Sequence, residues 1–142
     1  MKYMALLENE IQTAIDRHKA QSGVLFGNGQ IQEAIEQLIL AWDLLPPPKF
    51  NYDESYHLSR YITQMALKGE LFSLARSWSS INRMCDPERL DDGVKEFLAA
   101  TVEFEAGDLE LAFKFFEVAY EKSNRTCFDG KETKYRKFFM AR

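Results

Sequence analysis

The side chains of this chain that could bind a metal or attack a substrate include two cysteines and two histidines among 142 residues. Cys85 and Cys127 lie far apart in the sequence, and neither belongs to a Cys-x-x-Cys pair. A zinc site needs ligands clustered at short spacing, and only His18 and His57 could join the two cysteines. We therefore expect two reduced thiols and no metal site.

Other patterns that carry enzyme chemistry are missing as well. The run Gly27-Asn28-Gly29 has no following lysine and no preceding strand, so it lacks the pattern of a phosphate-binding loop. Both histidines fall in helical patterns without a nucleophile signature. Asp91 and Asp92 are adjacent, and adjacent residues point to different faces of a helix. We expect no catalytic residue, no cofactor and no enzyme activity.

The composition is that of an ordinary soluble globular protein, with 46% apolar and 28% charged residues. No apolar run approaches the roughly 20 residues of a membrane-spanning helix. The first ten residues contain acids, and no small-residue cleavage site follows, so a signal peptide is not expected. The expectation is a single cytoplasmic domain over residues 1–142 that does not contact a membrane.

Charge is unevenly distributed along the chain. Residues 86–110 contain nine acids and two bases, a net charge of −7, whereas residues 122–142 contain seven bases and two acids, a net charge of +5. An acidic patch disfavours nucleic acid and attracts a basic protein partner. The alternative is that these charges lie on solvated helix faces.

Three phrases repeat along the chain: "GQIQEAIEQLILAW" from Gly29, "GELFSLARSWSSIN" from Gly69 and "GDLELAFKFFEVAY" from Gly107. The residues five, nine and twelve positions after each glycine are apolar, and steps of four and three place them on one helix face. These residues are Ala34, Leu38 and Ala41, then Leu74, Trp78 and Ile81, then Ala112, Phe116 and Ala119.

Another periodic stretch precedes each phrase, over residues 5–26, 52–67 and 87–106. Helix-start signals accompany these stretches and the C-terminal segment: Asp86-Pro87, Asn51 with Glu54, and Asp129 with Glu132. The prediction is an all-α fold of three antiparallel helix pairs, over about 5–46, 51–85 and 87–124, followed by a helix over about 130–140.

This pattern resembles the tetratricopeptide repeat (TPR), whose period is about 34 residues. The three glycines lie at positions 29, 69 and 107, so loops must lengthen the repeat here. The first and third phrases match the small–large–small ladder of that family, whereas the second has Leu74 and Ile81 for the alanines and Ile62 for a small residue. The resemblance implies a short right-handed solenoid with a C-terminal capping helix.

Three consecutive prolines, Pro46-Pro47-Pro48, follow the first phrase. Pro46 stands where the family's terminal proline ends the second helix of a pair, because proline lacks the donor for the next backbone bond and disfavours helix at Leu45. We expect Pro47 and Pro48 to stiffen the following loop rather than to form a proline-rich ligand.

In this family the first helix of each pair lines a concave groove that binds a protein segment. Carried over to this chain with the acidic segment, the resemblance implies a partner surface, although aromatics at helical spacing are also typical of a core. The candidate residues are Phe26, Tyr56, Thr63, Phe97, Thr101, Glu103, Phe104 and Glu105. Lys19 matches the carboxylate clamp of chaperone-binding members, but Gly23 replaces its asparagine, so that role is not expected.

A narrower resemblance rests on "WDLLPPPKFNYDES", "FEAGDLELAFKFFEVAYEKS" and "FDGKETKYRKFF". Together these are similar to small bacterial TPR proteins encoded beside secreted polymorphic toxins. Such proteins are immunity proteins that bind and block the C-terminal toxin domain. The resemblance implies stoichiometric inhibition, and the acidic segment would suit a basic toxin. Two alternatives stay open, a cytoplasmic chaperone for a secretion-system translocator and a general TPR scaffold.

Overall fold

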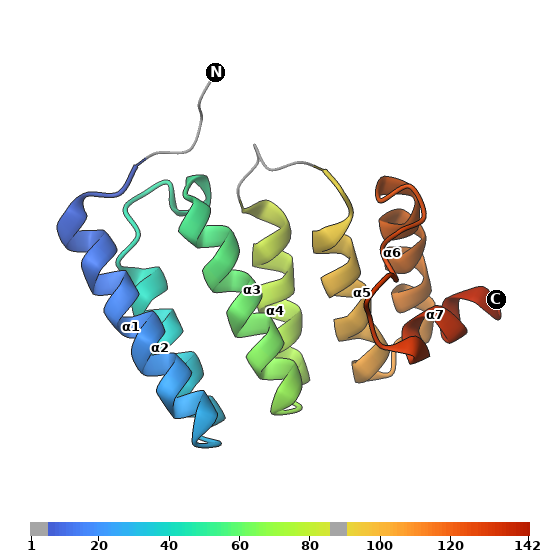
Figure 1. The fold of residues 1–142 in the computed structure, drawn as a ribbon, viewed down its shortest axis with the longest axis horizontal. Helices are drawn as coiled ribbons and strands as arrows, with labels where there is room; N and C mark the ends of the chain where they lie inside the picture. The colour runs from blue at the N-terminus through green and yellow to red at the C-terminus, as the bar shows by residue number, and fades with distance from the viewer. Residues whose placement is uncertain (1–5, 86–90) are drawn as a thin grey trace. The chain divides into compact units, whose positions relative to one another are not determined.

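The computed structural model describes residues 6–85 and 91–142. Over these residues the chain is all-α, with seven α-helices, one short 3₁₀ helix and no strand (Figure 1), as the sequence predicts. The helices are α1 (Asn9–Gly27), α2 (Ile31–Asp43), η1 (Lys49–Asn51), α3 (Asp53–Lys68), α4 (Phe72–Met84), α5 (Val94–Ala106), α6 (Leu109–Lys122) and α7 (Thr133–Met140). None of the helices in this described part is long and apolar enough to cross a bilayer.

Packing divides the described chain into two compact units. The N-terminal unit, residues 6–85, contains α1 to α4 and η1, and the C-terminal unit, residues 91–142, contains α5 to α7. Within the first unit α1 packs on α2, α3 on α4 and α2 on α3, and within the second α5 packs on α6. The expectation of one domain over residues 1–142 stays a prediction.

The helix boundaries follow the predicted ones closely except at the start of α5. The sequence places that start at Pro87, but α5 begins at Val94, after Gly93 in a left-handed conformation with φ of 88°. Asp92 Oδ1 accepts a hydrogen bond from the Val94 N–H at 3.1 Å. The predicted Asp86-Pro87 cap lies outside the described residues. Helix α2 ends at Asp43, before Pro46, in agreement with a proline terminator.

The two predicted capping boxes do not form. Tyr52 and Glu132 are the residues that precede α3 and α7, and neither makes a side-chain cap. Glu54 instead accepts from Lys19, and Asp129 pairs with Arg136. Glu54 and Asp129 thus form ion pairs in place of the predicted caps. Among the described helices, α6 has a side-chain cap at Asp108, whose Oδ1 accepts from the Leu111 N–H at 3.2 Å.

The core of the N-terminal unit lies between its helices and ends at a pair of tryptophans. Trp42 of α2 and Trp78 of α4 meet edge to face with ring centroids 5.2 Å apart, and Phe50 packs on Trp42. Lys49 donates to the carbonyls of Trp42 and Leu45 at the end of α2. A cation at this end of a helix complements its dipole. The Trp42–Trp78 contact therefore ties the C-terminal part of α2 to α4.

The C-terminal unit has an aromatic core. Phe116 of α6 is fully buried, and rings from α5, α7 and the connecting segment surround it. At the start of α5, Gly93 is buried against α6, because a Cβ at Gly93 would lie 2.7 Å from the carbonyl oxygen of Ala119. Both the positive φ and the close approach require glycine there. The other buried members of this core are Phe97, Ala100, Ala112, Ala119, Phe128 and Tyr135.

Candidate protein-binding surfaces

Three helix-to-helix turns share one hydrogen-bond pattern, which gives the register of the repeat. The N–H groups of Gln30, Leu71 and Asp108 each donate to the carbonyl five residues earlier in the chain. The carbonyl of each of these three residues then accepts a hydrogen bond from the N–H four residues later, at the start of the next helix. These are Schellman turns, which need a left-handed residue just past the helix. Gly29 and Gly107 fill that position with φ of 80° and 94°, but in the second turn it is Glu70, with φ of 57°, rather than Gly69.

The sequence alignment of the second phrase was therefore one residue out of register. Counted from Glu70, the small-residue position is Ala75, which is fully buried like Ala34 and Ala112. The next two positions are Ser79 and Asn82, so the assignment of Leu74, Trp78 and Ile81 to the ladder is wrong. Likewise the small residue of α3 is Thr63, equivalent to Ser22 and Ala100, rather than Ile62.

A polar network explains why Asn82 stands where the other pairs have alanine. Its Nδ2 donates to the Tyr56 carbonyl at 3.2 Å and to Ser59 Oγ at 3.0 Å. Thr63 Oγ1 donates to the Ser59 carbonyl at 2.8 Å. Asn82, Ser59 and Thr63 are all buried, and buried polar groups that are hydrogen-bonded cost little. At the Asn82 position the second pair thus joins its helices with hydrogen bonds, where the other pairs have Ala41 and Ala119.

The one-residue shift in register also changes which residues of α3 are exposed. Tyr56 and Thr63 are 4% and 0% exposed, so neither is a surface anchor in this structure, which corrects the expectation. One position further along, His57 is half-buried and Gln64 is exposed. On α1, Phe26 is half-buried, as a residue at the edge of such a surface would be. The exposed face of α3 therefore presents Gln64 and Tyr61 in place of the predicted anchor Tyr56.

On α5 the candidate residues are covered by the chain's own C-terminal segment. Phe97 is buried, with its ring centroid 5.5 Å from that of Phe128. Phe104 is half-buried and packs on Tyr135 and Phe138 at 5.3 and 5.2 Å. Because α7 and the segment before it supply these rings, Phe97 belongs to the core and is not an exposed anchor. Thr101 and Glu103 are also buried, at 8% and 6% exposure.

Four of the seven acidic residues described in 91–110 form ion pairs with bases of the C-terminal segment. These pairs neutralise part of the charge of the two stretches. The ion pairs are Lys122 with Asp91 at 2.8 Å, Lys122 with Glu96 at 2.9 Å, Lys134 with Glu105 at 2.7 Å and Arg142 with Glu110 at 3.0 Å. These four carboxylates are engaged within the chain, and attraction of a basic partner to this segment stays a prediction.

Glu105 links α5 to α7 through two side chains. Tyr135 Oη donates to Glu105 Oε2 at 2.9 Å, and Lys134 Nζ lies 2.7 Å from the same oxygen. Burial alone would raise the pKa of Glu105, but the hydrogen bonds from Lys134 and Tyr135 outweigh it, and the pKa falls below its ordinary value. Burial, and next the Glu105 carboxylate, raise the pKa of the Tyr135 hydroxyl. Glu105 thus holds α7 in place and is not free to bind a partner.

A polar cluster joins α1 to α3 in the N-terminal unit. Lys19 Nζ lies 3.0 Å from Glu54 Oε1, and Gln12 Nε2 donates to Glu54 Oε2 at 2.8 Å. Gln12 also donates to Asp16 on the exposed side of α1. These side chains satisfy one another, so they orient the two helices and offer few free groups to a ligand.

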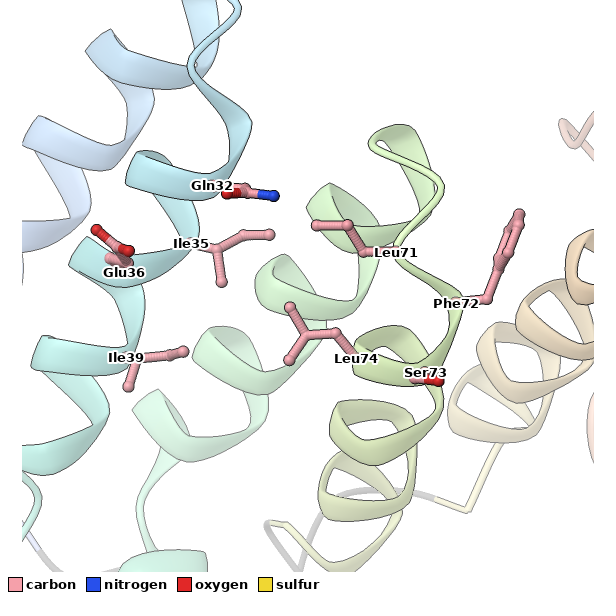
Figure 2. Close-up of a pocket in the computed structure, with 8 residues that line it drawn as sticks. All are labelled: Gln32, Ile35, Glu36, Ile39, Leu71, Phe72, Ser73 and Leu74. Atoms are coloured by element: carbon pink, nitrogen blue, oxygen red, sulfur yellow. The ribbon is translucent and has the colours of Figure 1, made fainter.

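An apolar hollow between α2 and α4 is the feature that the sequence did not indicate (Figure 2). Its volume is about 500 Å³, and its walls present Ile35 and Ile39 from α2 across from Leu71 and Leu74. Figure 2 shows these four side chains pointing into the gap, with Gln32 at its mouth. The remaining lining residues are Glu36, Phe72 and Ser73. The period of α2 does place Ile35 and Ile39 on one face, but Leu74 was assigned to the core in the slipped register.

No three His, Cys, Asp or Glu side chains gather into a possible metal site anywhere in 6–85 or 91–142. Cys85 is buried, and Cys127 is half-buried with burial raising the pKa of its thiol. Comparison with known proteins gives no match to a family model, to a curated protein or to a solved structure.

Proposed function

We propose that this chain is a protein-binding protein of TPR-like helix pairs. We further propose that it is an immunity protein, which neutralises the C-terminal toxin domain of a secreted effector in the cytoplasm by tight stoichiometric binding. The observation that carries the first step is the recurrence of one Schellman turn and one set of buried positions in all three pairs. Helix pairs of this kind stack to make extended binding surfaces.

The second step rests on the sequence resemblance to immunity proteins encoded beside polymorphic toxins. One structural feature suits that role. The polar and small side chains at the pair contacts are satisfied or buried, so the fold provides a preformed surface. Binding by a preformed surface avoids the cost of ordering loops, which favours tight inhibition. Neutralisation then follows from occupancy of the toxin, and no catalytic group is required.

Co-expression tests the proposal. The chain is produced together with the C-terminal domain of the toxin encoded beside its gene, and growth is compared with that of cells producing the toxin domain alone. We expect growth to be restored and the two proteins to co-purify in equal amounts. Growth arrest despite good yield of the folded chain contradicts the immunity function. Capture of an extended translocator segment in its place assigns the chain to the secretion chaperones.

A further inference from the structure

We propose that the exposed face of α3 is the surface on which the partner docks, and that its occupant is an acidic segment of that partner protein. This inference rests on the proposed protein-binding function and names the surface and the partner chemistry of that function. Steps of four, three and four residues place His57, Tyr61, Gln64 and Lys68 on one side of α3, with Arg60 at the edge. These five residues are the α3 face.

The second helix pair is a basic part of an acidic chain. With histidine counted as neutral, residues 55–85 contain four bases and one acid, a net charge of +3, whereas the whole chain has a net charge of −4. Complementary charge across an interface speeds encounter and fixes the register of the partner. This part of the chain therefore favours a negatively charged partner. The bases are Arg60, Lys68, Arg76 and Arg83, and the acid is Glu70.

Two of these cations lie on the α3 face without an internal partner. Arg60 is partly buried and Lys68 is exposed, and neither forms an ion pair or a side-chain hydrogen bond within residues 6–85 or 91–142. Asp53 and Glu54, in the first turn of α3, already contact other side chains. Eight residues of helix span about 12 Å, so two carboxylates roughly that far apart on a partner can meet both cations.

A stacked aromatic pair stands between the two cations and the start of α3. Tyr61 is 36% exposed, and its ring stacks on that of His57 with centroids 6.2 Å apart. Stacking restrains both side chains before a partner arrives, so less side-chain entropy is lost on binding. Tyrosine and arginine are the residue types that most often dominate binding energy at protein interfaces. The α3 face therefore offers an anchor as well as charge.

A glycine on α1 leaves room beside the α3 face. Gly23 stands in the interior of α1, where glycine is less favourable than alanine. A Cβ at Gly23 would meet nothing within 4 Å, so packing within the described chain does not require glycine there. Its neighbour Ser22 contacts Met65 of α3, with Oγ and Sδ 3.8 Å apart. A segment that lies on α3 can therefore approach the α1 backbone at Gly23.

The charges around the α3 face select an acidic protein segment over a nucleic acid. A nucleic acid carries a phosphate at every nucleotide, and its affinity comes from many contacts between cations and phosphates. The α3 face supplies two unpaired cations, and the same two helices carry the exposed acids Asp16 and Asp53. A long polyanion would meet these acids, whereas a short acidic segment can end before them.

A labelled peptide tests the α3 face without the natural partner. The probe has about twelve residues that alternate glutamate and serine, long enough to span both cations, and the control peptide has glutamine for every glutamate. Fluorescence anisotropy at low ionic strength gives the Kd. We expect saturable binding of the glutamate peptide that weakens as salt is added, and at least roughly tenfold weaker binding of the control. Tighter binding of a single-stranded oligonucleotide of the same length would assign the face to nucleic acid and overturn the inference.

Two double charge reversals of equal size locate the site. Arg60→Glu with Lys68→Glu changes the α3 face, whereas Arg17→Glu with Lys114→Glu changes exposed bases of α1 and α6. The Kd for the glutamate peptide should rise roughly tenfold or more in the first variant and stay within about twofold in the second. Equal Kd values for the two variants, or no saturable binding to the wild-type chain, overturn the inference.

A substitution at Gly23 separates binding from stability. Gly23→Gln should raise the Tm, because glutamine favours a helix more than glycine does, and yet raise the Kd roughly fivefold by filling the space beside α3. Ala20→Gln, at an exposed position of the same helix, is the control and should leave the Kd within about twofold. An unchanged Kd in Gly23→Gln would remove α1 from the docking surface.

The toxin assay separates this inference from the proposed function. If the wild-type chain and the Arg17/Lys114 variant restore growth and the Arg60/Lys68 variant does so less well at matched protein level, both the function and the docking surface are supported. If all three restore growth equally, the function stands and the α3 face is not the surface. If the wild-type chain fails to restore growth, the immunity function falls, and the peptide measurement alone decides the α3 face.

Discussion

Glu105 shows how one carboxylate sets the place of a helix. It accepts from Tyr135 and pairs with Lys134, both on α7, and these contacts keep its pKa below the ordinary value near 4.5. Its ionised form is therefore favoured in the folded state. The stability that it contributes is fully present above the unfolded pKa and is lost as pH falls through the lower folded pKa.

Replacing this carboxylate should flatten the acid dependence of stability. We expect Glu105→Gln to lower the free energy of unfolding by about 1 kcal/mol at pH 7. As pH falls below about 4.5, the difference from wild type should shrink, because the wild-type carboxylate then takes up a proton. Urea unfolding at several pH values measures this, with exposed Glu117→Gln as the control. A difference that stays constant down to pH 3 would show that Glu105 acts through packing alone.

Buried alanines mark the closest approach of the paired helices. Ala75 and Ala112 occupy equivalent positions and are fully buried. A leucine at either site has to displace its neighbours, so Ala75→Leu and Ala112→Leu should each cost about 1–3 kcal/mol. The same change at exposed Ala20 on α1 is the matched control and should be nearly neutral. If Ala75→Leu leaves the Tm unchanged, the register counted from Glu70 is wrong.

At the scale of the element, two glycines have nearly the same φ but differ in how closely other atoms pack against them. Gly93 precedes α5 and Gly107 follows it, with φ of 88° and 94°. A Cβ at Gly93 would meet the α6 backbone at Ala119, whereas nothing lies within 4 Å of one at Gly107. Comparing the same substitution at the two glycines therefore separates the effect of the close packing of α5 on α6 from the effect of the left-handed backbone conformation.

Alanine substitution measures that difference. Gly107→Ala should lower stability by about 1–2 kcal/mol, the cost of a left-handed conformation for a residue with a Cβ. Gly93→Ala adds a clash to the same strain and should cost at least about 1 kcal/mol more. Thermal unfolding followed by circular dichroism gives both values. Equal losses in the two variants would mean that α5 does not approach α6 as closely as described.

The existence and type of the helices could be predicted from the sequence because their apolar spacing is regular, and the predicted pairs match α1–α2, α3–α4 and α5–α6. Two features could not be predicted. The predicted register of the second pair is wrong because the sequence indicates a turn at Gly69, whereas Glu70 is the residue that adopts the left-handed conformation. The predicted exposure of Phe97 is wrong because α7 covers this side chain. Helical spacing alone does not distinguish an exposed aromatic side chain from a covered one.

At the scale of the whole molecule, each strongly charged stretch has a partner within the chain. Three bases of 122–142 pair with described acids of 91–110, namely Lys122, Lys134 and Arg142. The net charge of −7 that the sequence gives residues 86–110 therefore overstates the field that a partner meets there.

Titration calorimetry of the chain with the C-terminal domain of the toxin encoded beside its gene tests the proposed function most directly. We predict saturable binding with one chain per toxin domain and a Kd on the order of nanomolar or tighter, as for inhibitors that act by occupancy. Binding weaker than about a micromolar, or no heat at all with both proteins folded, would contradict an immunity function for this protein.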